Sequence, residues 1–393
     1  MGTYADPRVA QRPVGRYAPS VPPPPKVKAP TPKVKRRDPI WAKVCLIVGA
    51  LVMVGSGTLV VLPRMLVNAA TKNITKDLGI PEELRGANID GAINILLLGM
   101  DERSGNTTDP IRTDSMIIAH ISADHKQAYM ISLPRDTEVA IPDFPETNFK
   151  GYRTKINAAF AFGNLMNGKP DPSDEGRKRG VKLTVQTVNN LVPGGLKFNA
   201  VAVINFVGFR DVLDVIGGVQ MCVDERTTSV HFDKAGKYHS MIENVNQRKV
   251  YEKGCYEMAG YEALDFARQR YGVTGGDYGR QKHQQQLLTA IFKKMTSTGV
   301  LTNPNQLLKL QQVAGNLLTV DKGKTEVADW LVTLKGLNAN SVTMIKTNGG
   351  VPNTNAANNE VLTSDSMNLL KAVHDDTLYD FVAKHPDWIA STK

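Results

Sequence analysis

The stretch NILLLGMDERSGNTTDPIRTDSMIIAHISADHKQAYMISLPRD spans residues 94–136 and contains three apolar runs joined by two polar connections. Short apolar runs bounded by Gly, Pro, Asp and Ser predict β-strands, here at 93–99, 115–121 and 128–133. Strands that follow one another through short connections pair antiparallel, so we expect an up-down-up meander. The end of the first strand, the start of the second and the end of the third then lie at one edge of the sheet.

Five charged residues fall at that edge, namely Asp101, Arg112, Asp114, Arg135 and Asp136. Charged residues at strand ends are often solvated loop residues, and that interpretation stays open for each one. The combination of two carboxylates and two arginines is more informative. Asp101 and Asp114, 13 residues apart, could together hold a hard divalent cation. Arginines beside that cation could hold the anion that shares it.

A second charged group lies in AGYEALDFARQRYGVTGGDYGRQKHQQ, residues 259–285. Its first part predicts a helix at 259–267 that ends at Arg268 and Arg270. Two guanidinium groups at the C-terminal end of a helix also compensate the helix dipole, which is the simpler interpretation. A Gly-rich turn then separates this helix from the next one.

The next helix is predicted at 280–296, and Asp277, Arg280 and Gln284 fall on one of its faces. We interpret this polar stripe as the first turns of a helix that lines a cleft. Lys155 is a further candidate for an anion contact, although a lone lysine at a helix start is often only exposed. The excess of arginine over lysine favours bidentate recognition of phosphate oxygens, and a pyrophosphate would suit the surplus positive charge.

Other chemistries fit the sequence less well. It has no G-x-S-x-G, Walker A or H-E-x-x-H motif and no Cys/His nucleophile pair. The net charge of +10 does not indicate a nucleic-acid-binding domain, because residues 1–43 carry ten Lys or Arg against two acids. The remaining chain is close to neutral, so no nucleic-acid partner is expected.

The N-terminal region predicts a tail and a membrane anchor. Residues 1–40 hold 10 of the 22 prolines, which predicts a disordered, partly polyproline II segment. Residues 44–62 carry no charge and are just long enough to span a bilayer. The basic side faces the cytoplasm by the positive-inside rule, so the rest of the chain is expected outside the cell membrane. A cleaved signal peptide is the alternative to an anchor. For the tail, two roles stay open: a topogenic one and attraction to anionic lipid.

Of the three cysteines, Cys45 lies in the anchor, while Cys222 and Cys255 are expected in a compartment where disulfides persist. A bond between them would close a polar segment, 224–254, that we expect to be irregular. Free thiols remain the alternative.

From residue 92 onward strands and helices alternate without a Pro-rich or Ser-rich break, which predicts one α/β domain with a central mixed sheet flanked by helices. Further strands are expected at 200–204, 219–223 and 342–346, and helices at 156–163, 182–191, 206–216, 305–318, 326–334 and 364–373. The predicted organisation is a cytoplasmic tail at 1–40, an anchor at 41–63, a helical stalk at 64–91 and an extracytoplasmic domain at 92–393, with core motifs at 93–294 and a helical part at 295–393.

Seven segments, in this order, resemble the LytR-CpsA-Psr family of membrane-anchored cell-wall enzymes, and the resemblance covers about residues 93–294. The family usually has R-Q-Q where this chain has His283, Gln284 and Gln285, which leaves an arginine contact at 283 open. The matching segments are NILLLGMDER, RTDSMIIAHI, SLPRDTEVAIP, TKINAAFAFG, VINFVGFRDVLDVIGGV, CYEMAGYEALDFARQR and DYGRQKHQQQ.

The resemblance implies a phosphotransferase that moves a glycopolymer, with its phosphate, from a polyprenyl pyrophosphate carrier onto peptidoglycan. It implies a Mg²⁺ ion, with Mn²⁺ as an alternative, on Asp101 and Asp114. It also implies a membrane-bound polyprenyl donor whose tail lies in an apolar channel, for which candidates include Val201, Val203 and Leu213, although ordinary core is the better interpretation for each residue taken alone. The implied pyrophosphate ligands are Arg112, Arg135, Lys155, Arg268, Arg270, Arg280 and Gln284, with Arg112, Arg135, Asp101 and Asp114 as the catalytic set.

Two other functions stay open from the sequence. One is a pyrophosphatase that hydrolyses lipid pyrophosphates with water in place of the sugar hydroxyl. The other is a non-catalytic envelope sensor that binds lipid-linked phosphate and signals through the tail. The glycopolymer, the acceptor specificity, the general base and the oligomeric state are not indicated by the sequence.

Overall fold

The computed structural model describes residues 75–100, 110–205, 213–297, 318–334, 337 and 341–389. The predicted tail and anchor, the whole of residues 64–74 and Asp101 lie outside these residues. No helix in the described part has the length and hydropathy to cross a membrane.

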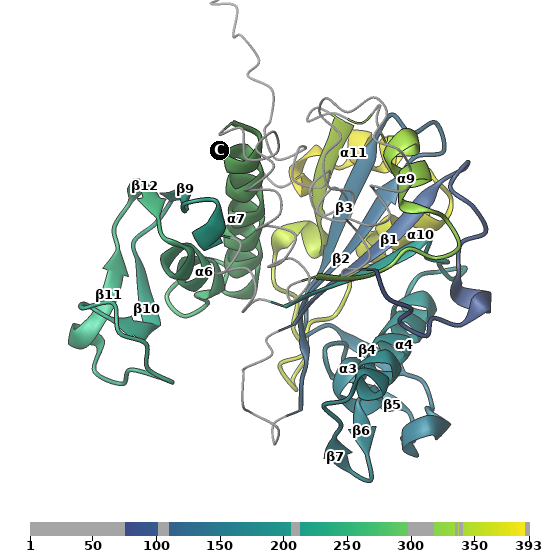
Figure 1. Ribbon diagram of the computed structural model, residues 1–393, viewed down its shortest axis with the longest axis horizontal. Coiled ribbons are helices and arrows are strands. Elements are labelled where there is room, and N and C mark those ends of the chain that lie inside the picture. The colour runs from purple at the N-terminus through teal and green to yellow at the C-terminus, as the bar shows by residue number, and fades with distance from the viewer. Residues whose placement is uncertain are drawn as a thin grey trace, which may run out of the picture. The chain divides into compact units, whose positions relative to one another are not determined.

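A six-stranded mixed sheet forms the centre of the described part, with strand order β13-β8-β1-β2-β3-β14 (Figure 1). β1, β2 and β3 are antiparallel neighbours, β8 is parallel to β1, and β14 is parallel to β3. Its strands are β1 (Ile93–Met100), β2 (Thr113–Ile121), β3 (Ala128–Leu133), β8 (Ala200–Asn205), β13 (Leu318–Asp321) and β14 (Val342–Lys346).

The register of the meander brings three strand ends together, as predicted. Met100, the last residue of β1, pairs with Thr113, the first residue of β2. Leu133, the last residue of β3, pairs with Met116 of β2. The segments that follow β1 and β3 and that precede β2 therefore start from the same edge of the sheet.

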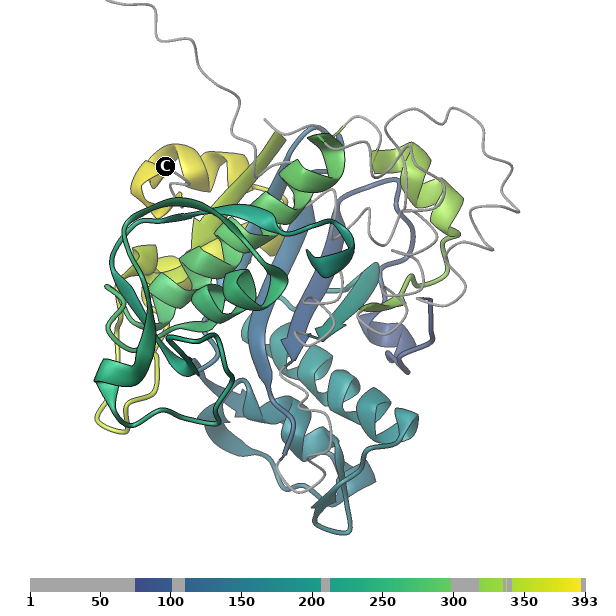
Figure 2. The same cartoon turned by 60° about the vertical axis from the view of Figure 1, so that its left-hand side comes forward.

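Alternate side chains of the strands point to opposite sides of the sheet, and apolar side chains occur on both sides. Helices therefore cover both faces. Leu96 and Leu98 of β1 pack with one group of helices, and Ile93 and Leu97 pack with the other. Figures 1 and 2 show α6 and α7 on the side of the sheet away from α4. The first group is α3 (Ala158–Gly163), α4 (Asp174–Leu191), α10 (Ser364–His374) and α11 (Leu378–Lys384), and the second is α6 (Gly260–Arg268), α7 (Asp277–Ser297) and α9 (Val327–Leu334).

Short strand pairs extend from this framework. The remaining strands are β4 (Glu138–Ile141) with β5 (Tyr152–Lys155), β6 (Leu165–Met166) with β7 (Lys169–Pro170), β9 (Val219–Val223) with β12 (Gly254–Met258), and β10 (Thr227–Asp233) with β11 (Arg248–Tyr251). Single 3₁₀ turns lie at η1 (Glu82–Leu84), η2 (Pro145–Thr147), η3 (Val245–Gln247), η6 (Thr347–Gly350) and η7 (Pro386–Trp388).

Several local expectations need correction. Residues 224–254 are not irregular, since they contain β10 and β11. The helical stalk is wrong for residues 75–90, where the one helical element described is the 3₁₀ turn Glu82–Leu84, Thr75 and Arg85 form isolated β-bridges, and Leu78 is buried against the domain. Residue 318, expected to end a helix, begins β13, so the part after 295 contributes strands to both edges of the sheet. The rest of the predicted helix at 305–318, and residues 206–212 of another, lie outside the described residues.

The helix predicted at 182–191 begins eight residues earlier than expected, at Asp174. The Ser173 hydroxyl accepts a hydrogen bond from the Gly176 amide at 3.1 Å and caps the helix. Asp174 and Glu175 in the first turn complement the helix dipole. Ser173, Asp174 and Glu175 are thus a sequence signal for the start of a helix. The helix begins there even though several charged residues follow.

A bidentate ion pair attaches the segment before β1 to the edge strand β13. Two Arg85 nitrogens contact the two Asp321 oxygens at 2.7 and 2.9 Å, and the Leu78 amide donates to Oδ2 at 3.0 Å. The Asp321 side chain is only 4% exposed. Burial alone would raise the pKa of Asp321, but the Arg85 guanidinium and the backbone donors lower it below its usual range.

We predict that Asp321→Ala lowers the free energy of unfolding by about 3–5 kcal/mol, because it removes the buried carboxylate that pairs with Arg85 and leaves this guanidinium with the exposed side chains of Asp77 and Glu82. Since the pKa of Asp321 is lowered in the folded state, its contribution is complete above the ordinary aspartate pKa and disappears as the pH falls through the lowered value. Urea unfolding at several pH values measures both effects. Lys324→Ala, which removes an exposed pair with Glu82, should change stability by less than about 1 kcal/mol. Equal losses in both variants would contradict the prediction.

Candidate functional site

An ion pair between Arg135 and Asp114 forms the centre of the candidate site. Asp114 lies near the start of β2, and Arg135 follows β3, so the meander brings both residues to the same sheet edge. Arg135 Nη1 lies 2.7 Å from Asp114 Oδ1, and the two side chains are 19% and 24% exposed. Partial exposure keeps this pair accessible to a ligand, while the protein on the other side limits its hydration.

A second guanidinium reaches the same residue from a distant part of the chain. Arg280, in the first turn of α7, donates from Nη2 to the Asp114 carbonyl oxygen at 3.1 Å. Arg280 is only 5% exposed. The first turn of α7 is thereby held against the start of β2, so the two charged segments found in the sequence meet in the fold.

Asp136 connects Lys155 to this centre. Lys155 Nζ lies 3.0 Å from Asp136 Oδ1, and Arg135 Nε lies 3.8 Å from Asp136 Oδ2. The backbone supports this arrangement, because the Asn157 amide donates to the Arg135 carbonyl at 3.2 Å. Lys155 ends the short strand β5, where the sequence had suggested a helix start.

Two other candidate residues, Arg112 and Gln284, lie close in the chain to members of this centre. Arg112 is exposed just before β2, and Gln284 is half-buried one turn after Arg280 on α7. Within the described part of the chain, no ion pair joins Arg112 to Asp114. Asp101, the other predicted metal ligand, cannot be placed because it lies outside that part.

Arg268 and Arg270 lie at the C-terminal end of α6, next to the connection to α7. Burial raises the pKa of Asp265, one turn before, and the positive charge of Arg268 is among the influences that oppose this rise. The Arg270 guanidinium lies 5.0 Å from the centre of the Tyr271 ring and donates to its hydroxyl at 3.0 Å. Among the described residues, Arg270 therefore contacts Tyr271 and not Asp114.

The turn after β9 contacts the connection between α6 and α7 and the first turns of α7. Glu225 accepts hydrogen bonds from the Thr274 amide at 2.8 Å and hydroxyl at 2.6 Å. Asp224 accepts from Lys282 and from His283 Nε2 on α7. Burial alone would raise the pKa of Asp224, but these two donors lower it. Sequence reasoning missed Asp224 and Glu225, because a turn after a short strand carries no signal of its partners.

The structure also explains position 283. The His283 ring is fully buried and stacks on Phe266 with ring centres 4.2 Å apart. Burial lowers the pKa of His283, against the influence of Asp224. His283 thus packs inside the domain between α7, α6 and the turn after β9, and it takes no part in the Arg135–Asp114 centre.

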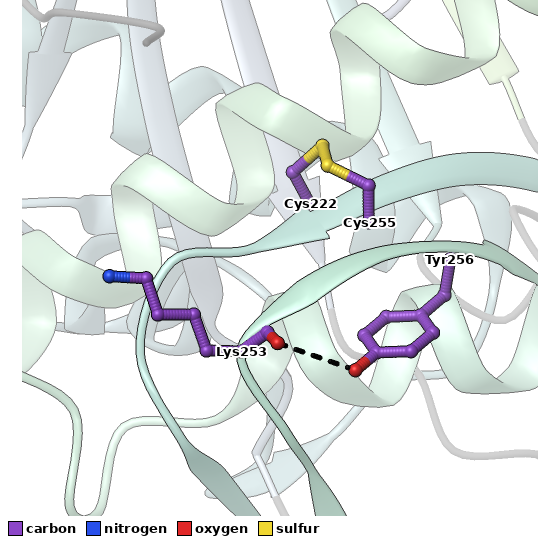
Figure 3. Close-up of a disulfide and its surroundings, with 4 residues drawn as sticks. All are labelled: Cys222, Lys253, Cys255 and Tyr256. Carbon is purple, nitrogen blue, oxygen red and sulfur yellow. Dashed lines mark hydrogen bonds between the residues drawn. A yellow bond between two sulfur atoms is a disulfide. The ribbon is translucent and has the colours of Figure 1, made fainter.

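A disulfide between Cys222 and Cys255, the two cysteines that the sequence analysis paired, crosslinks the strands beneath that turn. Cys222 and Cys255 are directly opposite one another in the antiparallel pair β9–β12. Figure 3 shows the bond between the strands, with the Tyr256 ring directed away from it and its hydroxyl 3.5 Å from the Lys253 carbonyl oxygen. Both cysteines are exposed, so a reductant can reach them.

The residues present suit a divalent cation that arrives with its anion. No group of three or more His, Cys, Asp or Glu that could hold a metal occurs among the described residues. Mg²⁺, however, is usually bound by one or two carboxylates together with substrate phosphates and water. One oxygen of Asp114 faces Arg135, and the carboxylate is partly exposed. A donor set of Asp114 and one further carboxylate therefore fits Mg²⁺ shared with a phosphate.

The candidate channel residues do not share one face of the sheet. Val201 and Val203 are buried with the helices α3, α4, α10 and α11, whereas Leu213 is buried with α6, α7 and α9. A single channel cannot be lined by both sets, because the sheet lies between them. In the described part, these side chains serve as ordinary core.

The fold and the site together define a class of protein, namely α/β proteins with a central mixed sheet. At one edge of this sheet the strand ends carry a cluster of arginines and carboxylates, which is a suitable environment for a phosphorylated ligand. Solved structures share the fold. The chain matches protein gbs0355 from Streptococcus agalactiae with a TM-score of 0.54 at 21% identity, covering 73% of this chain and 88% of that one. It matches TagV from B. subtilis with a TM-score of 0.50 at 22% identity, covering 74% and 98%.

The chain belongs to the LytR-CpsA-Psr family, whose sequence model matches residues 64–375. Among curated relatives, the polyisoprenyl-teichoic acid–peptidoglycan teichoic acid transferase TagU of Bacillus cereus is 32% identical over 231 residues, or 58% of this chain and 62% of that protein. The chain covers less than two thirds of the length of these curated relatives.

We predict that removing the disulfide with the double variant Cys222→Ser/Cys255→Ser lowers the free energy of unfolding by about 2–4 kcal/mol, because the unfolded chain then loses a closed loop. Urea unfolding with and without dithiothreitol measures the effect. Reductant should destabilise the wild-type chain and leave the double variant unchanged. A wild-type chain insensitive to reductant would contradict the prediction.

Proposed function

We propose that the protein is a membrane-anchored, extracytoplasmic phosphotransferase that moves a glycopolymer with its phosphate from a polyprenyl pyrophosphate carrier onto a hydroxyl of peptidoglycan. Family membership supports this proposal, as does the similarity to TagU, a polyisoprenyl-teichoic acid–peptidoglycan teichoic acid transferase. The observation that carries it is the convergence of Arg135 and Arg280 on Asp114. This arrangement places two guanidinium groups and a carboxylate where a diphosphate and its cation could share them.

In this proposal the guanidinium groups bind the pyrophosphate. Arg135 and Arg280 are held by Asp114, so little side-chain entropy is lost when they bind a ligand. Lys155 adds a point charge beside them through Asp136. The borders of the site would contribute the remaining ligands Arg112, Arg268, Arg270 and Gln284.

Phosphoryl transfer depends mainly on positioning and on neutralising the charge of the transferring group, with little covalent work for the protein. Asp101 and Asp114 would hold the Mg²⁺, and a bound Mg²⁺ supplies charge neutralisation at the phosphate oxygens. Arg135 and Arg280 would orient the phosphoryl group against the acceptor hydroxyl. The bulk of α6 and α7 beside the sheet edge would limit access of water, which competes with that hydroxyl.

We predict that Arg135→Ala or Asp114→Asn lowers the rate of polymer transfer by about 10²–10³, as expected for loss of one electrostatic group at a reacting phosphate. The assay combines full-length protein, lipid-linked polymer and peptidoglycan, and measures polymer attached covalently to peptidoglycan. Arg226→Ala is the matched control, because Arg226 makes only an exposed pair with Glu252.

Each result of that assay bears on the function. Release of lipid phosphate without attachment would indicate a pyrophosphatase instead. Normal attachment by folded Arg135→Ala or Asp114→Asn protein in cells would favour a non-catalytic sensor.

We predict that chelation with EDTA abolishes transfer and that added Mg²⁺, or Mn²⁺, restores it, because both ions accept carboxylate and phosphate oxygens. Asp114→Asn should raise the Mg²⁺ concentration needed for half-maximal activity. Full activity of chelated, metal-free protein would overturn the metal part of the proposal and leave the transferase part standing.

A further inference from the structure

A buried carboxylate, that of Glu360, belongs to a residue that is hydrogen-bonded to two segments of the candidate site. Glu360 is 5% exposed, and its Oε1 accepts three hydrogen bonds. The donors are the Tyr278 hydroxyl at 2.9 Å, Asn348 Nδ2 at 2.6 Å and the Asn353 amide at 3.1 Å. A buried carboxylate needs such donors, since leaving it without them would cost several kcal/mol.

The main chain of Glu360 is attached to the segment that carries Arg135. The Glu360 amide donates to the Asp136 carbonyl at 2.9 Å, and the Glu138 amide donates to the Glu360 carbonyl at 2.7 Å. Residues 136–138 are thus paired with Glu360 on both sides of Thr137, which forms a parallel β-bridge with it. Any shift of Glu360 would move the turn that follows Arg135.

The side chain of Glu360 is attached to the other half of the site. Tyr278 lies in the first turn of α7, two residues before Arg280, and it is 9% exposed. Its hydrogen bond to Glu360 joins residues 82 positions apart. Arg280 in turn donates to the Asp114 carbonyl. Glu360 therefore connects the segment of Arg135 with the helix that carries Arg280.

We propose that Glu360 is a positioning residue that sets the separation of Arg135 and Arg280 through its backbone pairing with 136–138 and its side-chain contact with Tyr278. This inference rests on the proposed phosphotransferase function. A carboxylate suits the role better than an apolar side chain of similar size, because its hydrogen bonds fix direction as well as distance. Displacements of about 1 Å in such a site are enough to cost about 10²-fold in rate.

Tyr278→Phe is the sharpest test, because it removes one hydroxyl and keeps the ring. We expect this variant of the full-length protein to lose about tenfold in kcat for polymer transfer, with the KM for the lipid-linked donor changed less than twofold. Glu360→Leu, which keeps the backbone pairing and removes the acceptor, should show a similar loss, whereas Glu360→Gln should lose less than twofold, because its amide oxygen can still accept the hydrogen bond from Tyr278. The double variant Tyr278→Phe/Glu360→Leu should be no worse than the more affected single variant, since both substitutions remove the same hydrogen bond.

A stability effect is separated from a positioning effect by two controls. Thr187→Val removes another buried hydroxyl bond, from Thr187 Oγ1 to the Leu183 carbonyl at 2.7 Å in α4, and should leave kcat unchanged at a comparable change in melting temperature. In an Arg280→Ala background, Tyr278→Phe should cost less than twofold, because the group that it positions is absent. A tenfold loss in both backgrounds, or a lower melting temperature with normal kcat in the wild-type background, would overturn the inference.

Binding keeps this test distinct from that of the proposed function. If the wild-type protein transfers no polymer, the proposed function fails, and the inference is then judged from the affinity of the same variants for a non-hydrolysable polyprenyl methylenediphosphonate. Weaker binding of this probe by Tyr278→Phe, absent in the Arg280→Ala background, would support the positioning role. Unchanged affinity would refute it.

Discussion

Asp114 contacts two guanidinium groups, one through its carboxylate and the other through its main-chain carbonyl oxygen. The architecture of the site depends on these two contacts. Arg135 arrives through the meander, at 2.7 Å from the carboxylate. Arg280 arrives from a helix 166 residues further along the chain, at 3.1 Å from the carbonyl oxygen. Two positive groups would repel one another if the intervening carboxylate and carbonyl did not lie between them. Asp114 therefore permits a concentration of positive charge that a diphosphate could use.

The helix that carries Arg280 is held from two directions by acidic residues that no ligand needs to touch. On one side, Asp224 contacts Lys282 and His283, and Glu225 contacts Thr274. On the other side, Glu360 accepts from Tyr278. Such supporting contacts matter for phosphoryl transfer, because the rate depends on how closely the charged groups match the transferring phosphoryl group.

The elements that could be predicted were those with local signals. The strands at 128–133, 219–223 and 342–346 were predicted with their bounds, because each is a short apolar or alternating run between turn residues. β13 was missed, since its four residues follow a segment with a helical pattern and its pairing with β8 is a tertiary contact. The hairpin of β10 and β11 was missed for a related reason: its polar residues give little periodicity, and the crosslinked strands beside it bring its ends together.

By itself, the sequence determined the meander, and with it the meeting of Asp114 and Arg135, because antiparallel pairing through short connections leaves few alternatives. It also carried the family resemblance through its ordered motifs, and the family match over residues 64–375 confirms that resemblance. Only the tertiary structure decided that α7 lies against the start of β2, that His283 is buried on Phe266, and that Glu360 joins the two halves of the site. Most of those contacts join residues far apart in the chain. Their geometry follows from the packing of the whole core, which local sequence patterns do not predict.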